Sequence, residues 1–366
     1  MKFATGSPKD TWHPMVKADT TTLTYWLNWR VYLCSICLLV PAIFSIVLIW
    51  KYESFRKPAR NGSLESQKEK EEEEEEVSQT LYEDETWRPC LRGIHPAWLL
   101  AFRILAFSVL SVFLIFNASK QGGKIFYFYT DWTLASITFY FGLGSLLSLH
   151  GCYQHQKKAS GDKVEVEIDI DIVGSDSPDL EQGTYHDPPL PLSSITSNQD
   201  KDLGFQEKNE HLVRQPAGAC GYIFQIIFQM NAGAVMLTDC VFWFVIFPFL
   251  TKKNHNIDFI IITTHTINAV FLLTETALNC LRFPWFRIGY FGLWTFSYVV
   301  FQWLVHGFVK LWWPYPVLDV SSPFAPLWYL SVTILHIPCY GIMALIMKMK
   351  HTLLSAWYPD SYLCVK

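Results

Sequence analysis

Residues 122–144 read GGKIFYFYTDWTLASITFYFGLG, and this stretch decides how the rest of the chain is interpreted. From Tyr129 onward it stays mostly apolar for about 20 residues, the length that a helix needs to cross the hydrocarbon core of a bilayer. Yet Thr130, Asp131 and Thr133 stand at its beginning. The stretch therefore predicts a membrane-spanning helix that carries polar groups at its mouth.

The composition of the whole chain supports a membrane protein. Of 366 residues, 51% are hydrophobic and 16% are aromatic, whereas only 17% are charged. Soluble domains have about 25% charged residues. The surplus of apolar residues is therefore expected to face lipid. A net charge of -4 argues against nucleic acid as a partner.

Apolar runs long enough to span a bilayer recur along the sequence. They cover residues 31–50, 97–116, 129–149, 222–250, 257–279, 288–309 and 326–347. The predicted fold class is therefore all-α, a polytopic transmembrane helix bundle of about seven spans. The first run has no small-residue cleavage site after it, so it is expected to act as a signal anchor.

These runs divide the chain into tails, spans and two long polar loops. Residues 51–96 include a glutamate-rich run, and residues 154–219 are rich in Ser, Pro and Asp. Such segments cannot bury enough apolar surface to fold, so both are predicted to be disordered loops, with docking of a cytosolic partner as the alternative. The remaining segments are the N-terminal tail 1–30, the first span 31–50, spans two and three within 97–153, spans four to seven within 220–347, and the tail 348–366.

The distribution of Lys and Arg predicts the orientation, because cytoplasmic loops carry the excess. The N-terminal tail and the second, fourth and sixth loops hold 9 of these residues, against 19 in the other loops and the C-terminal tail. The N-terminus is therefore predicted to be lumenal or extracellular, and both long loops and the C-terminus cytosolic. The glycosylation patterns at Asn61 and Asn117 are accordingly expected to stay unused.

Other patterns favour structural roles. Nine cysteines are scattered along the chain, and those in apolar segments, Cys280 among them, are expected to pack as small hydrophobic residues. No H-E-x-x-H motif is present, so no metal or other cofactor is predicted. The aromatic residues around the sixth loop are typical of an interfacial belt: Trp312, Trp313, Tyr315 and Trp328.

Ionisable residues inside the apolar runs are candidates for function, because a charge in hydrocarbon is costly. Arg103 lies in the second run and Asp239 in the fourth, near its middle. Their opposite charges predict an intramembrane ion pair, with packing and a transport or catalytic role as the two interpretations. The other ionisable residues in the runs are His265, Glu275, His306 and His336.

Thr130 and His265 are a candidate catalytic pair. In the predicted topology both lie near the lumenal side, and a hydroxyl with an imidazole at similar depth is what a nucleophile and its general base require. Asn268, three residues after His265, is expected to orient the ring. The alternatives are that Thr130 is a helix N-cap and that His265 is a packed hydrogen-bonding group.

Three segments resemble the androgen-induced membrane protein superfamily, which includes rolling-stone-like and many plant members. They read FYFYTDW, HTINAVFLLTE and LVHGFVKLWWPYPVL. For the androgen-induced branch, the resemblance implies an intramembrane threonine hydrolase that cleaves fatty acid esters of hydroxy fatty acids. Its essential threonine and histidine match Thr130 and His265, and Asp131 and Glu275 are the supporting residues within the same segments.

Three functions therefore remain open at the level of sequence. The first is a hydrolase of lipid esters in an endomembrane or the plasma membrane, with membrane lipids as its partners and substrate. The second is a non-enzymatic protein of membrane adhesion, fusion or scaffolding, as the rolling-stone resemblance suggests. The third is a transporter that uses Arg103, Asp239 and Glu275 as pathway charges.

Overall fold

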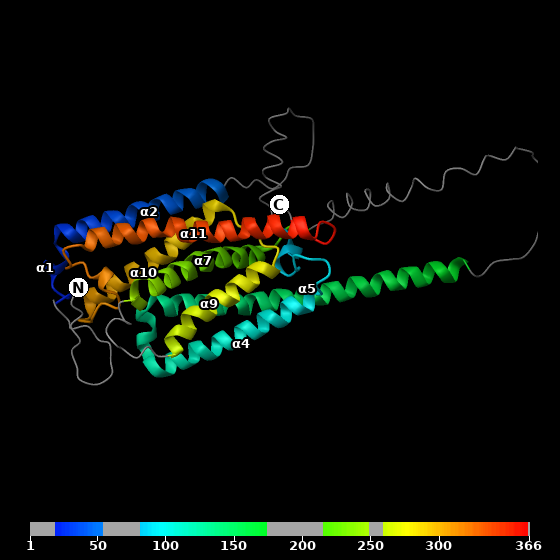
Figure 1. Ribbon diagram of the computed structural model, residues 1–366, viewed down its shortest axis with the longest axis horizontal. Helices are drawn as coiled ribbons and strands as arrows, with labels where there is room; N and C mark the ends of the chain where they lie inside the picture. Colours follow the sequence, from blue (N-terminus) through cyan, green and yellow to red (C-terminus); the bar gives the residue numbers. More distant parts are fainter. Residues whose placement is uncertain (1–18, 54–80, 174–214, 249–258, 365–366) are drawn as a thin grey trace, which may run out of the picture.

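The computed structural model describes residues 19–53, 81–173, 215–248 and 259–364. Long helices lie side by side in one bundle (Figure 1). Within the described residues, six helices are long and apolar enough to cross a membrane. The predicted all-α polytopic bundle is thus confirmed. The long helices are α2 (Trp29–Glu53), α4 (Pro96–Gln121), α5 (Tyr129–Val173), α7 (Ala219–Val241), α9 (Phe259–Leu278), α10 (Ile288–Phe308) and α11 (Ala325–Trp357).

Helix α9, which corresponds to the predicted fifth span, is the long helix outside that group of six. Its 20 residues rise about 30 Å, which equals the thickness of the hydrocarbon core. It packs against α7, α4 and α5. We therefore treat α9 as part of the bundle.

The loops differ from the prediction where they join the bundle. Helix α5 continues to Val173, beyond the predicted end of the third span at residue 149. Residues 81–95, expected to be disordered, form an ordered segment that includes the short helix η1 (Glu83–Thr86) and buries Leu81 and Cys90. The glutamate-rich run, the loop from 174 to 214 and Asn61 lie outside the described residues, so their predicted disorder and partner docking remain predictions.

Successive long helices run in opposite directions, so the bundle has two ends (Figure 1). Helices α2, α5, α9 and α11 begin at one end, which we call the Thr130 end. They finish at the other, which we call the Cys364 end, where α4, α7 and α10 begin. The first and last long helices therefore enter and leave the bundle at opposite ends, as the predicted topology requires.

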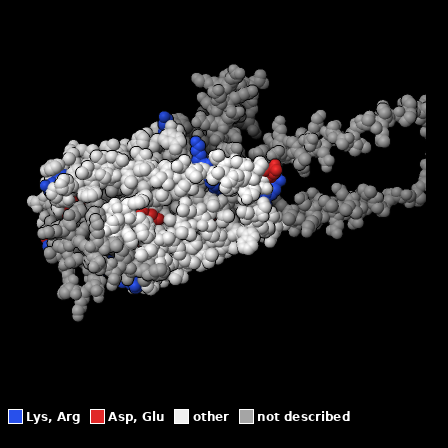
Figure 2. Space-filling model, viewed as in Figure 1, with Lys and Arg blue, Asp and Glu red and all other residues white. Residues whose placement is uncertain are grey.

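The outer surface of the bundle is apolar. Side chains such as Ile43 of α2, Ile115 of α4 and Leu345 of α11 are more than half exposed. In Figure 2 the face shown is mostly white, with few charged atoms along its length. Exposed apolar patches of this extent are unusual on soluble monomers, and they fit helices that face lipid.

Helix α7 joins the two main hydrophobic clusters. One cluster includes Phe291 of α10 and Tyr329 of α11, and the other includes Leu134 of α5 and Leu272 of α9. A Cβ atom at Gly233 of α7 would lie 2.4 Å from the ring of Phe291. The glycine therefore allows α7 and α10 to approach closely, which a larger residue would prevent.

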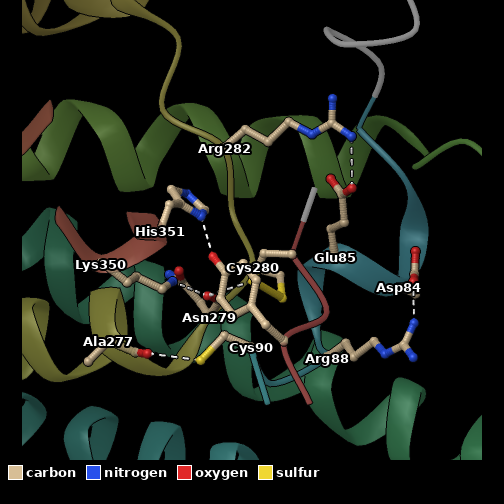
Figure 3. The surroundings of a disulfide bond; sticks show 12 residues. Asp84, Glu85, Arg88, Cys90, Ala277, Asn279, Cys280, Arg282, Lys350 and His351 are labelled. Carbon is tan, nitrogen blue, oxygen red and sulfur yellow. Dashed lines mark hydrogen bonds and ion pairs between the residues drawn. A yellow bond between two sulfur atoms is a disulfide. The ribbon is translucent and has the colours of Figure 1, made fainter. Parts of the chain in front are cut away.

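Three chain segments meet at the Cys364 end. The backbone N–H of Arg92 donates to Ser361, and that of Leu363 donates to Cys90, at 2.8 and 3.0 Å. A disulfide joins Cys280 to Cys364 across 84 positions of sequence (Figure 3). The prediction that Cys280 is only a small apolar residue is therefore wrong. Its partner lies in the C-terminal tail, which the pattern of apolar runs could not place.

The disulfide and the Lys and Arg distribution favour opposite orientations. Disulfides persist in oxidising compartments and are rare in the cytosol, whereas the positive residues place the Cys364 end in the cytosol.

The glycosylation pattern at Asn117 lies in a buried place. Asn117 is 8% exposed, and its side-chain amide donates to Asp131 at 3.2 Å. Asn117 is therefore buried, and Asn61 is the glycosylation pattern that reports the orientation.

We expect the full-length chain made in cells to show no glycosidase-sensitive mobility shift, because Asn61 is predicted to be cytosolic. Since the structure joins Cys280 to Cys364, a maleimide added to denatured extracts without reductant should label seven of the nine cysteines. A glycosidase-sensitive shift that disappears in Asn61→Gln would reverse the orientation.

Candidate functional site

Thr130 is the second residue of α5 and is half-buried. Its hydroxyl and the backbone N–H groups of Tyr129 and Thr130 lie close to the phenol oxygen of Tyr315. The first four N–H groups of a helix have no partner within it, so Tyr315 caps α5 from the connection between α10 and α11. Burial raises the pKa of Tyr315 to about 12, so its phenol stays neutral near pH 7.

Asp131 holds the beginning of α5 to the end of α4. It is 6% exposed, and its carboxylate accepts the hydrogen bond from the Asn117 amide. A negatively charged carboxylate in the first turn also interacts favourably with the positive end of the helix dipole. Asp131 therefore stabilises the first turn of α5. It forms no hydrogen bond with Thr130 or His265 within the described residues.

His265 lies on α9 and faces the end of α7. Its Nδ1 is 3.4 Å from Oδ1 of Asp239, and its ring stacks on Phe242 with the centroids 3.9 Å apart. Phe242 begins η3 (Phe242–Ile246), a π-helical turn that continues α7. Such turns are frequent at functional sites.

Asn268 does not have the predicted orienting role. Its Oδ1 is buried and has no hydrogen-bond partner within the described residues. Asp239 contacts the ring instead. The Asp239 carboxylate reaches Nδ1 from the end of α7, so a group from another helix already occupies that side of the ring. A carboxylate at Nδ1 leaves Nε2 as the nitrogen that can accept a proton.

Thr130 and His265 lie at the same depth. Tyr140 of α5 donates to Glu275 of α9 at 2.9 Å. Thr130 precedes Tyr140 by ten residues, and His265 precedes Glu275 by ten. Since both helices run from the Thr130 end, each residue lies roughly 15 Å along its helix from the bonded pair. Thr130 and His265, both among the described residues, form no hydrogen bond with each other, and the Thr130 hydroxyl lies near Tyr315 instead.

Thr130 and His265 each share a helix face with buried residues. Thr130 shares a face of α5 with Leu134 and Ile137, four and seven residues later, and His265 shares a face of α9 with Leu272. Leu134, Ile137 and Leu272 belong to one buried cluster. The two residues thus lie at the Thr130 end of helices that both pack against α7.

Arg103 forms its ion pair with Glu275. The guanidinium Nη2 lies 2.6 Å from the carboxylate, and neither side chain is exposed. The Arg103 plane also lies over Phe224, 4.9 Å from the ring centroid. Further N–H groups of Arg103 donate to the backbone carbonyls of Thr86 and Gly144 and to the hydroxyl of Ser148.

The predicted pair between Arg103 and Asp239 is therefore wrong. Asp239 is near the end of α7, not at mid-membrane, because that helix begins at Ala219 and ends at Val241. Asp239 contacts His265, whereas Arg103 pairs with Glu275. His265 and Glu275 lie roughly 15 Å apart along α9. Charge alone could not assign the partners.

Two residues of the sixth loop contribute to the site region, where the sequence predicted an interfacial belt, with a substrate-gating lid as the alternative. Tyr315 caps α5, and Trp313, 8% exposed, stacks on His306 with centroids 3.8 Å apart. The belt prediction is therefore wrong for Trp313. The sequence WWPYP indicated aromatic residues near a membrane surface. It did not indicate that Trp313 and Tyr315 point into the protein.

No group of three potential metal-ligating side chains occurs among the residues that the structure describes. Comparison of the chain with protein-family models, with curated proteins and with solved structures found no match.

Proposed function

We propose that this multipass membrane protein hydrolyses lipid esters, with Thr130 as the nucleophile and His265 as its general base. The observation that carries the proposal is the contact between Asp239 and Nδ1 of His265. In many hydrolases a carboxylate orients a histidine, and the histidine activates a hydroxyl as the nucleophile. Here the histidine and the hydroxyl lie at the same depth in the bundle.

The proposed reaction begins when Thr130 turns from Tyr315 toward Nε2 of His265. As Oγ1 bonds to the ester carbonyl carbon, its proton passes to Nε2, and the imidazolium then gives that proton to the departing alkoxide. Water next attacks the acyl-threonine with His265 as base, which releases the fatty acid. Asp239 holds the imidazole through its contact with Nδ1.

The apolar surroundings favour a lipid as substrate. The helices that carry Thr130 and His265 have an apolar outer surface, so a substrate that dissolves in the bilayer would meet this surface without entering water. Fatty acid esters of hydroxy fatty acids, which the family resemblance implies, have this property. The fatty acyl chain is then expected to pack along the interior faces of α5 and α9.

The contacts of Arg103 and Glu275 argue against transport. Residues of a transport pathway line a water-filled cavity, but these two side chains are fully buried and bonded to each other. Adhesion or scaffolding would depend on the long loops, which lie largely outside the described residues.

The proposal is tested by activity-based labelling. We expect a fluorophosphonate probe to label the purified full-length protein, and peptide mass spectrometry to find the adduct on Thr130. The same protein should hydrolyse a branched fatty acyl ester. An adduct elsewhere, or no adduct while a compact member of the androgen-induced superfamily reacts, would contradict the hydrolase and favour scaffolding.

A further inference from the structure

A groove of about 410 Å³ lies on α11 at the Cys364 end, far from Thr130. Its lining comes from two neighbouring rows of α11 and from Phe283, in the connection between α9 and α10. Volumes of this size hold small ligands or lipid head groups. The α11 residues that line it are Ala344, Met347, Lys348, His351, Thr352 and Ser355.

The chemistry of the groove changes along the helix. Ala344, Met347 and Phe283 make one part apolar, and Thr352 and Ser355 make the other part polar. Lys348 and His351 lie between them. The last apolar run of the sequence ends at residue 347, so the change falls where α11 is expected to leave the hydrocarbon. The groove therefore matches an amphiphile that lies across the membrane surface.

Lys348 gives the groove a positive charge, and no acidic side chain among the described residues pairs with it. It is exposed and forms no ion pair within the described part of the chain. Lys350, two residues later, behaves differently, since it is buried and its Nζ donates to the Asn279 carbonyl (Figure 3). The lining contains no carboxylate, so a ligand with a cationic group would find no counter-charge.

His351 is held in place by the C-terminal tail. Its Nδ1 bonds to the hydroxyl of Tyr362, and Tyr362 pairs with Leu91 beside the Cys280–Cys364 disulfide. No hydrogen bond to its Nε2 is recorded in the described residues. The ring therefore presents that nitrogen in a fixed position next to Lys348, so two nitrogen groups are available to an anion.

We infer that this groove binds a phospholipid with an anionic head group. The acyl chain packs on Ala344, Met347 and Phe283, and the phosphate lies at Lys348 and His351. The predicted orientation places the groove in the cytosolic leaflet, where anionic lipids are concentrated. The membrane-side apolar part favours a lipid over a soluble phosphate compound, which would leave that surface without a contact.

The inference is tested by thermal unfolding of the purified full-length protein during titration with short-chain phosphatidic acid. We expect the unfolding temperature to rise with phosphatidic acid and not with phosphatidylcholine. Lys348→Ala should weaken the apparent affinity about fivefold, the factor that one lysine contributes at an anionic membrane surface. Lys310→Ala removes an exposed lysine at the Thr130 end and should leave the affinity unchanged.

Two further measurements separate a lipid from a free anion. Ala344→Phe fills the apolar part of the groove, so it should reduce the response to phosphatidic acid while its unfolding temperature without lipid stays near that of the wild type. Inorganic phosphate alone should cause no shift. An equal response of Lys348→Ala and wild type, a response to phosphatidylcholine, or saturation by inorganic phosphate would overturn the inference.

Discussion

Replacing Arg103 with alanine should lower the free energy of unfolding by about 3–5 kcal/mol, the cost of breaking a buried ion pair. The substitution leaves the Glu275 carboxylate without its cation in a place with no solvent access. It also removes the donor of the Thr86 and Ser148 contacts. Thermal or denaturant unfolding in detergent measures the effect.

The partly exposed pair of Arg88 and Asp84 provides the matched control. These side chains are 33% and 22% exposed and lie four residues apart. Surface pairs of this kind contribute about 0–1 kcal/mol, so Arg88→Ala should change the stability little. An equally large loss in Arg88→Ala would mean that the measurement reports something other than burial of charge.

A double substitution identifies the partner of Arg103. Arg103→Met with Glu275→Leu removes both charges and should recover much of the stability lost in Arg103→Ala, because apolar residues replace buried pairs at little cost. Adding Asp239→Ala to Arg103→Ala should recover nothing, since Asp239 contacts His265. Recovery with Asp239 would contradict the assigned pair.

Thr130→Ala should abolish both probe labelling and ester hydrolysis, because no other group then supplies the attacking oxygen. His265→Ala should lower hydrolysis by roughly 100-fold to 10,000-fold, the range for loss of a general base. Asp239→Asn should lower it by a similar factor, because an amide can stabilise the wrong tautomer of the ring. Rates are compared at equal amounts of folded protein in the membrane.

Thr133→Ala is the control for Thr130→Ala. Its hydroxyl is fully buried and donates to the Tyr129 carbonyl at 3.0 Å, so its loss should leave activity within a few fold. Full turnover by Thr130→Ala would make Thr130 only a capping residue that bonds Tyr315. An unchanged rate in Asp239→Asn would remove Asp239 from the proposed mechanism.

The length of apolar runs determined the fold class, because a helix that crosses hydrocarbon needs about 20 apolar residues whatever its neighbours are. It did not fix where helices end. Helix α5 continues to Val173, since polar residues end the contact with lipid without ending the backbone hydrogen bonds. Residues 81–95 pack against the bundle although the segment is mostly polar, because it contains the apolar residues Leu81 and Cys90, which are buried.

The sequence by itself also determined which residues are candidates for function, since charges and imidazoles are costly in a membrane and stand out there. Only the tertiary structure decided their partners. Arg103 meets Glu275, and His265 meets Asp239, because each pair lies at the same depth on facing sides of different helices. The fold also brings Tyr315 close to Thr130. It brings Cys364 to Cys280. Each contact joins segments distant in sequence, so no local pattern of residues encodes it.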